Sequence, residues 1–272
     1  MPKFYLKHFQ SNTGHIFNYS RQRGNFVTGP ENISVGKDFY SEDTELLLST
    51  KIEGPASDSI RKILNRIELD ENARLSFVDF VLNLEKRGPS GKQRIIDLMP
   101  TGKREVAYKV KREISDEIKK NPKRETELLD VKEGMINAIK EISADEIWGI
   151  TFDPEHAPKA RAIILKMHWI FLVSDSSQFF VTSDNPVFIL KRDEVLSISA
   201  ELSFPISKNM TFLATWNKSE SGLYKKIGLP IIKKINRRTI VSAIENVYSP
   251  SGYNWIPRVL VKRRLEYRNI KV

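Results

Sequence analysis

The spacing of apolar residues changes near residue 167, and this change constrains the fold more than any other feature. Before it, apolar residues recur every three or four positions, as in residues 71–87, where Leu75, Val78 and Leu82 share one helix face. After it, short runs of β-branched and aromatic residues alternate with polar turns, which is typical of strands. Segregated helices and strands predict an α+β fold.

These two patterns give the order of the elements. Alternating residues at 15–19 and 24–27 flank turn residues and predict an N-terminal hairpin. We expect helices at 41–54, 56–68, 71–87, through most of 95–147, at 161–166 and at 231–247, with Gly54-Pro55 ending the first. We expect a C-terminal antiparallel sheet from strands at 169–173, 179–182, 187–190, 198–204 and 210–216, and a last strand at 258–264. The chain is predicted to form one domain, residues 1–272, with a helical insert at about 56–167.

Composition excludes several classes of site. The 272 residues include no cysteine, which excludes disulfides, thiolate zinc sites, iron–sulfur clusters and a cysteine nucleophile. Absence of cysteine also favours the cytoplasm. Lysines and a histidine interrupt the first ten residues, so they do not resemble a signal peptide. The longest apolar runs are far shorter than the roughly 18 residues of a membrane span. We therefore expect a cytoplasmic protein without a membrane partner.

Positive charge is concentrated in the C-terminal part of the chain. The net charge is +10, and residues 203–272 alone hold 14 Lys and Arg against 3 Asp and Glu. Such an uneven field attracts polyanions. The charge therefore predicts nucleic acid, DNA or RNA, as a partner; the alternative is a solubilising surface that binds nothing specific.

A basic helix is the clearest candidate for binding phosphate. In IIKKINRRTIVSAIENV, the apolar residues that share one side include Ile232 and Ile235. The opposite side is predicted to carry four cations, which repel one another unless solvent or phosphate compensates them. The predicted nucleic-acid-binding residues are Lys233, Lys234, Arg237 and Arg238, with Arg263 and Arg264 farther along.

An acidic stripe marks the first long helix. Glu42, Glu45, Ser49 and Glu53 recur on one face at 100° per residue. Glu45 and Glu53 are two turns apart, about 12 Å along the axis, so they cannot bind one metal ion unless a third group bridges them. The stripe is either an acidic site or a solvated helix face.

A polar turn between two apolar runs raises the same choice. In FFVTSDNPVFIL, residues 179–190, the polar residues Thr182 to Asn185 separate two apparently buried strands. Asp184 and Asn185 before Pro186 form a good turn without any other role. Polar groups between buried strands nevertheless need partners. The turn is therefore structural, or it borders a site that uses Asp184.

Six stretches together resemble the uncharacterised, mainly bacterial family catalogued as domain of unknown function 4238. They span nearly the whole chain, although residues 95–160 match little, and TSDNPV followed by FPIS is the most specific pair. The family has no agreed activity, so the resemblance implies candidate positions and not a mechanism. The stretches are PKFYLKHF (2–9), DFY (38–40), the glutamates Glu45 and Glu53, FVTSDNPVF (180–188), FPIS (204–207) and INRRTIVSA (235–243).

Two functions from different classes fit these observations. In the first, the protein acts on nucleic acid as a metal-dependent nuclease, with Glu45, Glu53 and Asp184 as the acidic site. Mg²⁺ would bind through one or two of these carboxylates and the substrate phosphates. In the second, it is a non-catalytic nucleic-acid or protein interaction module, and the TSDNPV turn is structural. A further alternative rests on Arg161 and His168, whose spacing resembles the motif of HEPN ribonucleases.

Overall fold

Two β-sheets carry the fold. A computed structural model of the chain describes residues 1–33, 42–191, 194–218, 222–262 and 271–272. The larger sheet has the order β5-β6-β7-β3-β8 and the smaller one β2-β1-β9-β4. Neighbouring strands are antiparallel except β3 and β8, which are parallel. The strands are β1 (Ile16–Ser20), β2 (Gly24–Thr28), β3 (His168–Ser174), β4 (Thr182–Ser183), β5 (Phe188–Leu190), β6 (Glu201–Ser207), β7 (Met210–Thr215), β8 (Tyr224–Ile227) and β9 (Asn246–Ser249).

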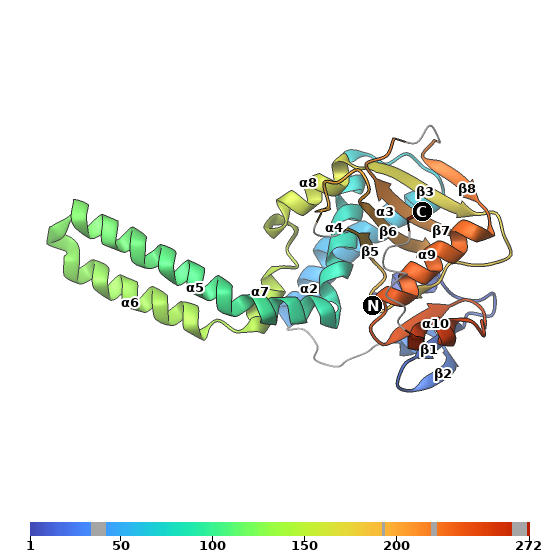
Figure 1. Cartoon of the computed structure of the whole chain (residues 1–272), viewed down its shortest axis with the longest axis horizontal. Coiled ribbons are helices and arrows are strands. Elements are labelled where there is room, and N and C mark those ends of the chain that lie inside the picture. Colours follow the sequence, from blue (N-terminus) through green and yellow to red (C-terminus); the bar gives the residue numbers. More distant parts are fainter. Residues whose placement is uncertain (34–41, 192–193, 219–221, 263–270) are drawn as a thin grey trace.

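Helices surround the sheets and fill the middle of the sequence (Figure 1). A π-helical turn (Leu48–Glu53) separates α2 from α3, and short 3-10 turns lie at Pro30–Asn32, Pro122–Arg124 and Pro154–His156. The α-helices are α1 (Lys3–Lys7), α2 (Glu42–Leu47), α3 (Gly54–Leu64), α4 (Glu71–Arg87), α5 (Pro89–Lys120), α6 (Glu125–Glu141), α7 (Ala144–Ile150), α8 (Pro158–Lys166), α9 (Leu229–Ser242) and α10 (Ile256–Lys262).

The larger sheet is buried on both faces. Phe171 of β3 packs edge-on against Phe77 of α4, with ring centroids 6.3 Å apart. Its neighbour Ile170 points to the other face, where it joins Ile232 of α9 in a separate apolar cluster. Because successive side chains of a strand point to opposite faces, both sets must be apolar, which explains the nearly continuous apolar runs. The sheet is thus the middle layer between α4 and α9.

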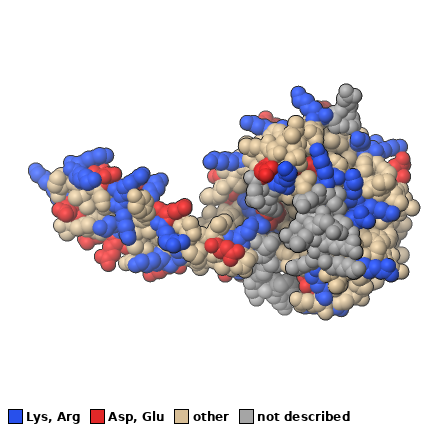
Figure 2. Space-filling view, viewed as in Figure 1, with Lys and Arg blue, Asp and Glu red and all other residues tan. Residues whose placement is uncertain are grey.

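The helices α5 and α6 form an antiparallel hairpin that projects from the compact part of the molecule (Figures 1 and 2). We call this hairpin the arm. Near its base Lys103 Nζ donates a hydrogen bond of 2.7 Å to the backbone oxygen of Lys140, which fixes the relative register of the two helices. Among the described residues, no helix is both long and apolar enough to cross a membrane.

The predicted fold class, hairpin and helical middle are confirmed, but two boundaries were wrong. The first helix does not end at Gly54-Pro55: it continues through the π-helical turn into α3, where Pro55 stands in the first turn. Proline is tolerated there because its missing N–H would have no partner in that turn. Because the π-helical turn replaces the usual hydrogen bonds between residues four apart, no ordinary α-helical hydrogen bond from residue 55 is required.

The C-terminal segment also differs from the prediction. Residues 256–262 form α10 instead of a strand. Ile256 and Leu260, four residues apart, are both buried in one apolar cluster, which is a helical spacing. The helix predicted at 231–247 ends at Ser242, and Val247 belongs to β9. The stretch RVLVKRR at 258–264 has only three consecutive apolar residues, too few for their spacing to separate helix from strand.

Candidate functional site

Asp184 anchors the loop that follows α9. Its Oδ1 accepts a hydrogen bond from the backbone N–H of Ile244 at 2.9 Å, and its Oδ2 accepts two, from Glu245 and Asn246, both at 2.8 Å. Burial raises the pKa of Asp184, and the three N–H donors act in the opposite direction. The carboxylate therefore holds together the backbone that joins α9 to β9.

The other polar groups of the turn have partners as well. The Thr182 hydroxyl lies 2.6 Å from the Tyr5 hydroxyl, which also donates to the backbone oxygen of Pro205 at 2.8 Å. The Asn185 amide donates to the backbone oxygen of Ser242 at 3.0 Å. Buried polar groups satisfied in this way stabilise one arrangement of the chain. This geometry supports the structural interpretation of the TSDNPV turn.

Glu53 and Asp184 both lie within electrostatic reach of the Met1 amino group, whereas Glu45 lies apart. Glu53, at the end of the π-helical turn, pairs with Arg87 of α4 at 2.6 Å. The Met1 amino group is buried beside them: burial and then the Arg87 charge lower its pKa to about 6, against the charges of Glu53 and Asp184. Glu45 is exposed on α2. Of the predicted acidic site, two carboxylates therefore share a neighbourhood.

A bound metal ion would have few ligands here. In the described parts of the chain, no three His, Asp or Glu side chains converge in an arrangement that could hold a metal ion. Asp184 already accepts three backbone hydrogen bonds, and Glu53 has Arg87 as its partner. An ion such as Mg²⁺ would have to compete for both carboxylates and take its other ligands from water or substrate phosphate.

The basic helix presents three of its four predicted cations to solvent. Lys233, Lys234 and Arg237 are exposed on α9. Arg238 is fully buried and pairs with the equally buried Glu201 of β6, so its placement on the exposed face was wrong. One residue further along a helix turns the side chain by about 100°, which takes Arg238 from the solvent side to the sheet side. No local pattern around Arg238 indicates the acid that compensates its charge, because Glu201 lies 37 residues away in the sequence.

Several predicted positions cannot be placed. Arg263 and Arg264 lie outside the described residues, as does the DFY stretch at 38–40. Their proposed roles remain predictions.

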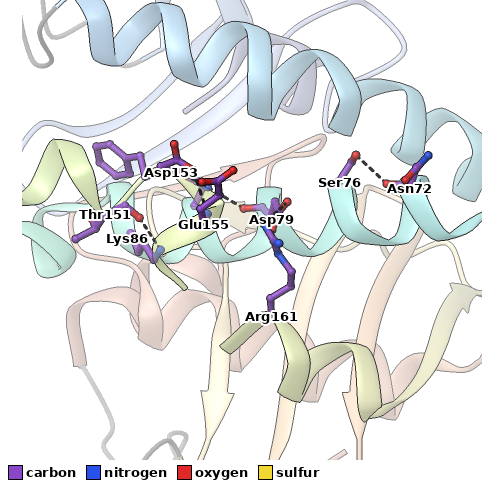
Figure 3. A network of polar contacts seen from close by, with 10 residues as sticks. Asn72, Ser76, Asp79, Lys86, Thr151, Asp153, Glu155 and Arg161 are labelled. Carbon is purple, nitrogen blue, oxygen red and sulfur yellow. Dashed lines mark hydrogen bonds and ion pairs between the residues drawn. The ribbon is translucent and has the colours of Figure 1, made fainter. Parts of the chain in front are cut away.

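A polar network that the sequence did not predict ties α8 to α4 (Figure 3). Arg161 of α8 donates two hydrogen bonds to Asp79 of α4, from Nε to Oδ1 at 2.8 Å and from one terminal nitrogen to Oδ2 at 3.1 Å. About two turns farther along α4, Lys86 donates to the backbone oxygen of Thr151 at 2.6 Å. A lone aspartate inside FVDFVL, an otherwise apolar helix face, was the available signal.

The charges of this network offset one another. Burial raises the pKa of Asp79, while Arg161 and Lys86 act to lower it. Burial likewise lowers the pKa of Lys86. Arg161 is held by a bidentate pair to Asp79, whereas His168 is exposed at the start of β3. The arrangement therefore supports a structural role for Arg161 better than the nuclease-like Arg–His pairing.

Among the comparisons with known proteins, only the one with protein families gives a match. The sequence profile of the family described as protein of unknown function (DUF4238) matches residues 1–252. No curated protein and no solved structure matches the chain significantly.

The three hydrogen bonds that Asp184 accepts predict that replacing it lowers the stability of the fold and leaves nucleic-acid affinity unchanged. In Asp184→Asn an amide N–H₂ replaces one carboxylate oxygen and faces backbone donors, so at least one N–H loses its acceptor. We expect unfolding free energy to fall by about 1–3 kcal/mol in urea denaturation. The control is Asp175→Asn at an exposed position, with a change below about 0.5 kcal/mol. Equal stability of both variants would contradict the anchoring role of Asp184.

The buried pair of Arg238 and Glu201 makes a second prediction. In Glu201→Gln the guanidinium stays buried without its compensating charge, which costs about 3–5 kcal/mol. The double variant Glu201→Leu, Arg238→Met removes both charges and should recover most of this loss. Guanidinium chloride unfolding of the single and double variants measures the difference. A double variant less stable than the single one would show that the charge itself is not the source of the cost.

Proposed function

We propose that this chain, which belongs to the DUF4238 family, is a cytoplasmic protein that binds the phosphate backbone of nucleic acid through the exposed face of α9. The observation that carries the proposal is the run of exposed cations on this helix. In Figure 2 blue side chains lie over the position of α9, on the side of the compact part away from the arm. We call this surface the basic face; it consists of Lys225, Lys233, Lys234, Arg237 and Arg258, all exposed.

The basic face has little acidic compensation. Residues 222–262 contain one acidic residue, Glu245. Its Oε1 accepts hydrogen bonds from the Ser20 hydroxyl at 2.5 Å and from the Gln22 N–H at 2.7 Å, so it is engaged with the N-terminal hairpin. The exposed Asp175 also lies beside β8, where its N–H donates to the backbone oxygen of Ile227 at 3.0 Å. The cations outnumber these two acids, and an excess of clustered cations creates a local positive potential that attracts polyanions.

The spacing of the cations suits phosphate better than bases. Lys233 and Arg237 are four residues apart and hence neighbours on one helix face, about 6 Å from each other. This is comparable to the spacing of successive phosphates along a strand. Lys and Arg contacts to phosphate position a protein on nucleic acid but do not read sequence. The binding should therefore be salt-dependent and largely independent of sequence.

Neutralising the basic face should weaken binding to every nucleic acid of a given length. For the triple variant Lys233→Gln, Lys234→Gln, Arg237→Gln, we expect the slope of log affinity against log salt to become shallower by about 2–3 units. Fluorescence anisotropy with a labelled duplex and a labelled single strand, between low and physiological salt, measures this slope.

The matched control removes the same charge from the arm. Lys109, Lys111 and Arg112 are exposed on α5, and their triple Gln variant should leave the slope and affinity nearly unchanged. Equal losses in both variants would mean that net charge alone, and not the basic face, attracts the nucleic acid. Absence of any binding by the wild type would overturn the proposal.

Hydrolysis is a second candidate, favoured by the common neighbourhood of Glu53 and Asp184. Both carboxylates act electrostatically on the buried amino group of Met1, and Glu53 also pairs with Arg87. An acid beside a cation is a common arrangement at sites of phosphoryl chemistry. The partners that each carboxylate already has make binding the better-supported function.

A cleavage assay separates the two candidates. Labelled DNA and RNA, single- and double-stranded, are incubated with Mg²⁺, Mn²⁺ or EDTA. If the site is hydrolytic, cleavage requires metal and falls at least 100-fold in Glu53→Gln. The exposed Glu45 supplies the control, since Glu45→Gln should then keep full activity. Binding without cleavage under all these conditions would leave the non-catalytic function.

A further inference from the structure

The arm exposes most of its apolar side chains. In residues 92–142 the buried apolar residues are Val110 and Leu128, each 7% exposed. By contrast Val106 is 50% exposed, Val131 and Met135 are 45% exposed. A two-helix layer gains most of its stability from packing an amphipathic face against another layer. In the described part of the chain, no second layer covers the two helices of the arm.

The exposed apolar residues share one side of the arm. At 100° per residue, Val131 and Met135 fall within about 40° of each other on α6, and Ile142 follows the helix as its C-cap residue. The bond from Lys103 to Lys140 sets Val106 beside the same stretch of α6. Val106 precedes the buried Val110 by four residues, so its side chain is rotated by about 40° from the contact with α6. It therefore lies on the same side of the hairpin as Val131 and Met135. We call this side the apolar face of the arm: Val106, Val131, Met135 and Ile142.

The two helices carry opposite charge. α5 has nine Lys and Arg against five Asp and Glu, whereas α6 has five Asp and Glu against two Lys. Two copies of the arm can stack with their apolar faces together in a four-helix bundle. If the twofold axis runs along the arms, each basic α5 lies over the acidic α6 of the other copy. If the axis runs across the arms, like-charged helices meet instead.

We propose that the apolar face of the arm binds the same face of a second copy of this chain, with the twofold axis along the arms. The partner's α6 offsets the charge of α5, and a closed, self-complementary interface results. α6 has 17 residues, about 25 Å, and two helices side by side are about 20 Å wide. The contact then buries about 500 Å² per chain, or about 1,000 Å² in total. This is at the lower end for specific interfaces and indicates a concentration-dependent dimer.

The arm variants test the surface. We expect the full chain to be dimeric in sedimentation velocity at about 100 µM and to dissociate on dilution. Val131→Glu with Met135→Glu should make it monomeric at every concentration, because two charges would be buried at the interface. Tyr108→Glu is the matched control: Tyr108 is 69% exposed and lies on the far side of α5, so the dimer should persist. A wild type that stays monomeric, or a double variant that stays dimeric, would overturn the proposal.

Single cysteines test the direction of the axis. The chain contains no cysteine, so each introduced thiol is unique. With the axis along the arms, equivalent residues lie at the same height but on diagonally opposite helices, a separation too long for a disulfide. Val131→Cys and Ile142→Cys should therefore both be linked into dimers by a bismaleimide reagent that spans the diagonal of the bundle. With the axis across the arms, Ile142 at the base of one arm would lie at the tip of the other. Failure of Ile142→Cys to cross-link would overturn the proposed orientation, and Tyr108→Cys controls for random collision. The test is independent of nucleic-acid binding.

Discussion

The rest of the structure depends on how the segment 179–186 is held between the two sheets. Its backbone joins β4 of the smaller sheet to β5 of the larger one. The backbone N–H and C=O groups of the segment therefore cannot all be hydrogen-bonded within one sheet. The side chain of Asn236 on α9 fills the gap: its oxygen accepts from the N–H of Val181 at 3.0 Å, and its amide donates to the oxygen of Phe179 at 2.9 Å. Asp184 returns the contact by binding the loop after α9. Helix α9 and the segment 179–186 therefore hold each other in place, and together they connect the two sheets.

This interaction explains why the family-like stretches meet in space although they are far apart in sequence. Tyr5 from PKFYLKHF contacts Thr182 from TSDNPV and the backbone of Pro205 from FPIS, and its ring stacks on Phe204 at 5.3 Å. Asn236 belongs to INRRTIVSA. Four of the shared stretches, PKFYLKHF, FVTSDNPVF, FPIS and INRRTIVSA, thus meet at the junction of the two sheets. A sequence pattern of this kind marks the fold, so the function is better sought on surfaces that the junction orients, such as the exposed side of α9.

The fold could be predicted where local pattern and tertiary environment agree. The helical spacing of α4 and the alternation of the hairpin survive in the structure because their apolar sides face the core. Prediction failed where a distant partner decides the outcome. From the sequence, Arg238 looks like one more exposed cation of a basic helix. Its burial depends on Glu201, which pairs with it from 37 residues away in the sequence. In the same way, the pairing of Asp79 with Arg161 spans 82 residues and leaves no local signal except a charge on an apolar face.

The proposed surfaces occupy opposite sides of the molecule, and this placement links them physically. The arm projects from one side of the compact part, and α9 covers the other (Figure 1). Pairing through the arm therefore leaves both basic faces accessible. If both proposals hold, two weak, sequence-independent contacts on one dimer would act on the same nucleic acid with a high effective concentration for the second contact. A face with only a few phosphate contacts binds weakly at physiological salt, so joining two such faces would raise the apparent affinity without any base-specific contact.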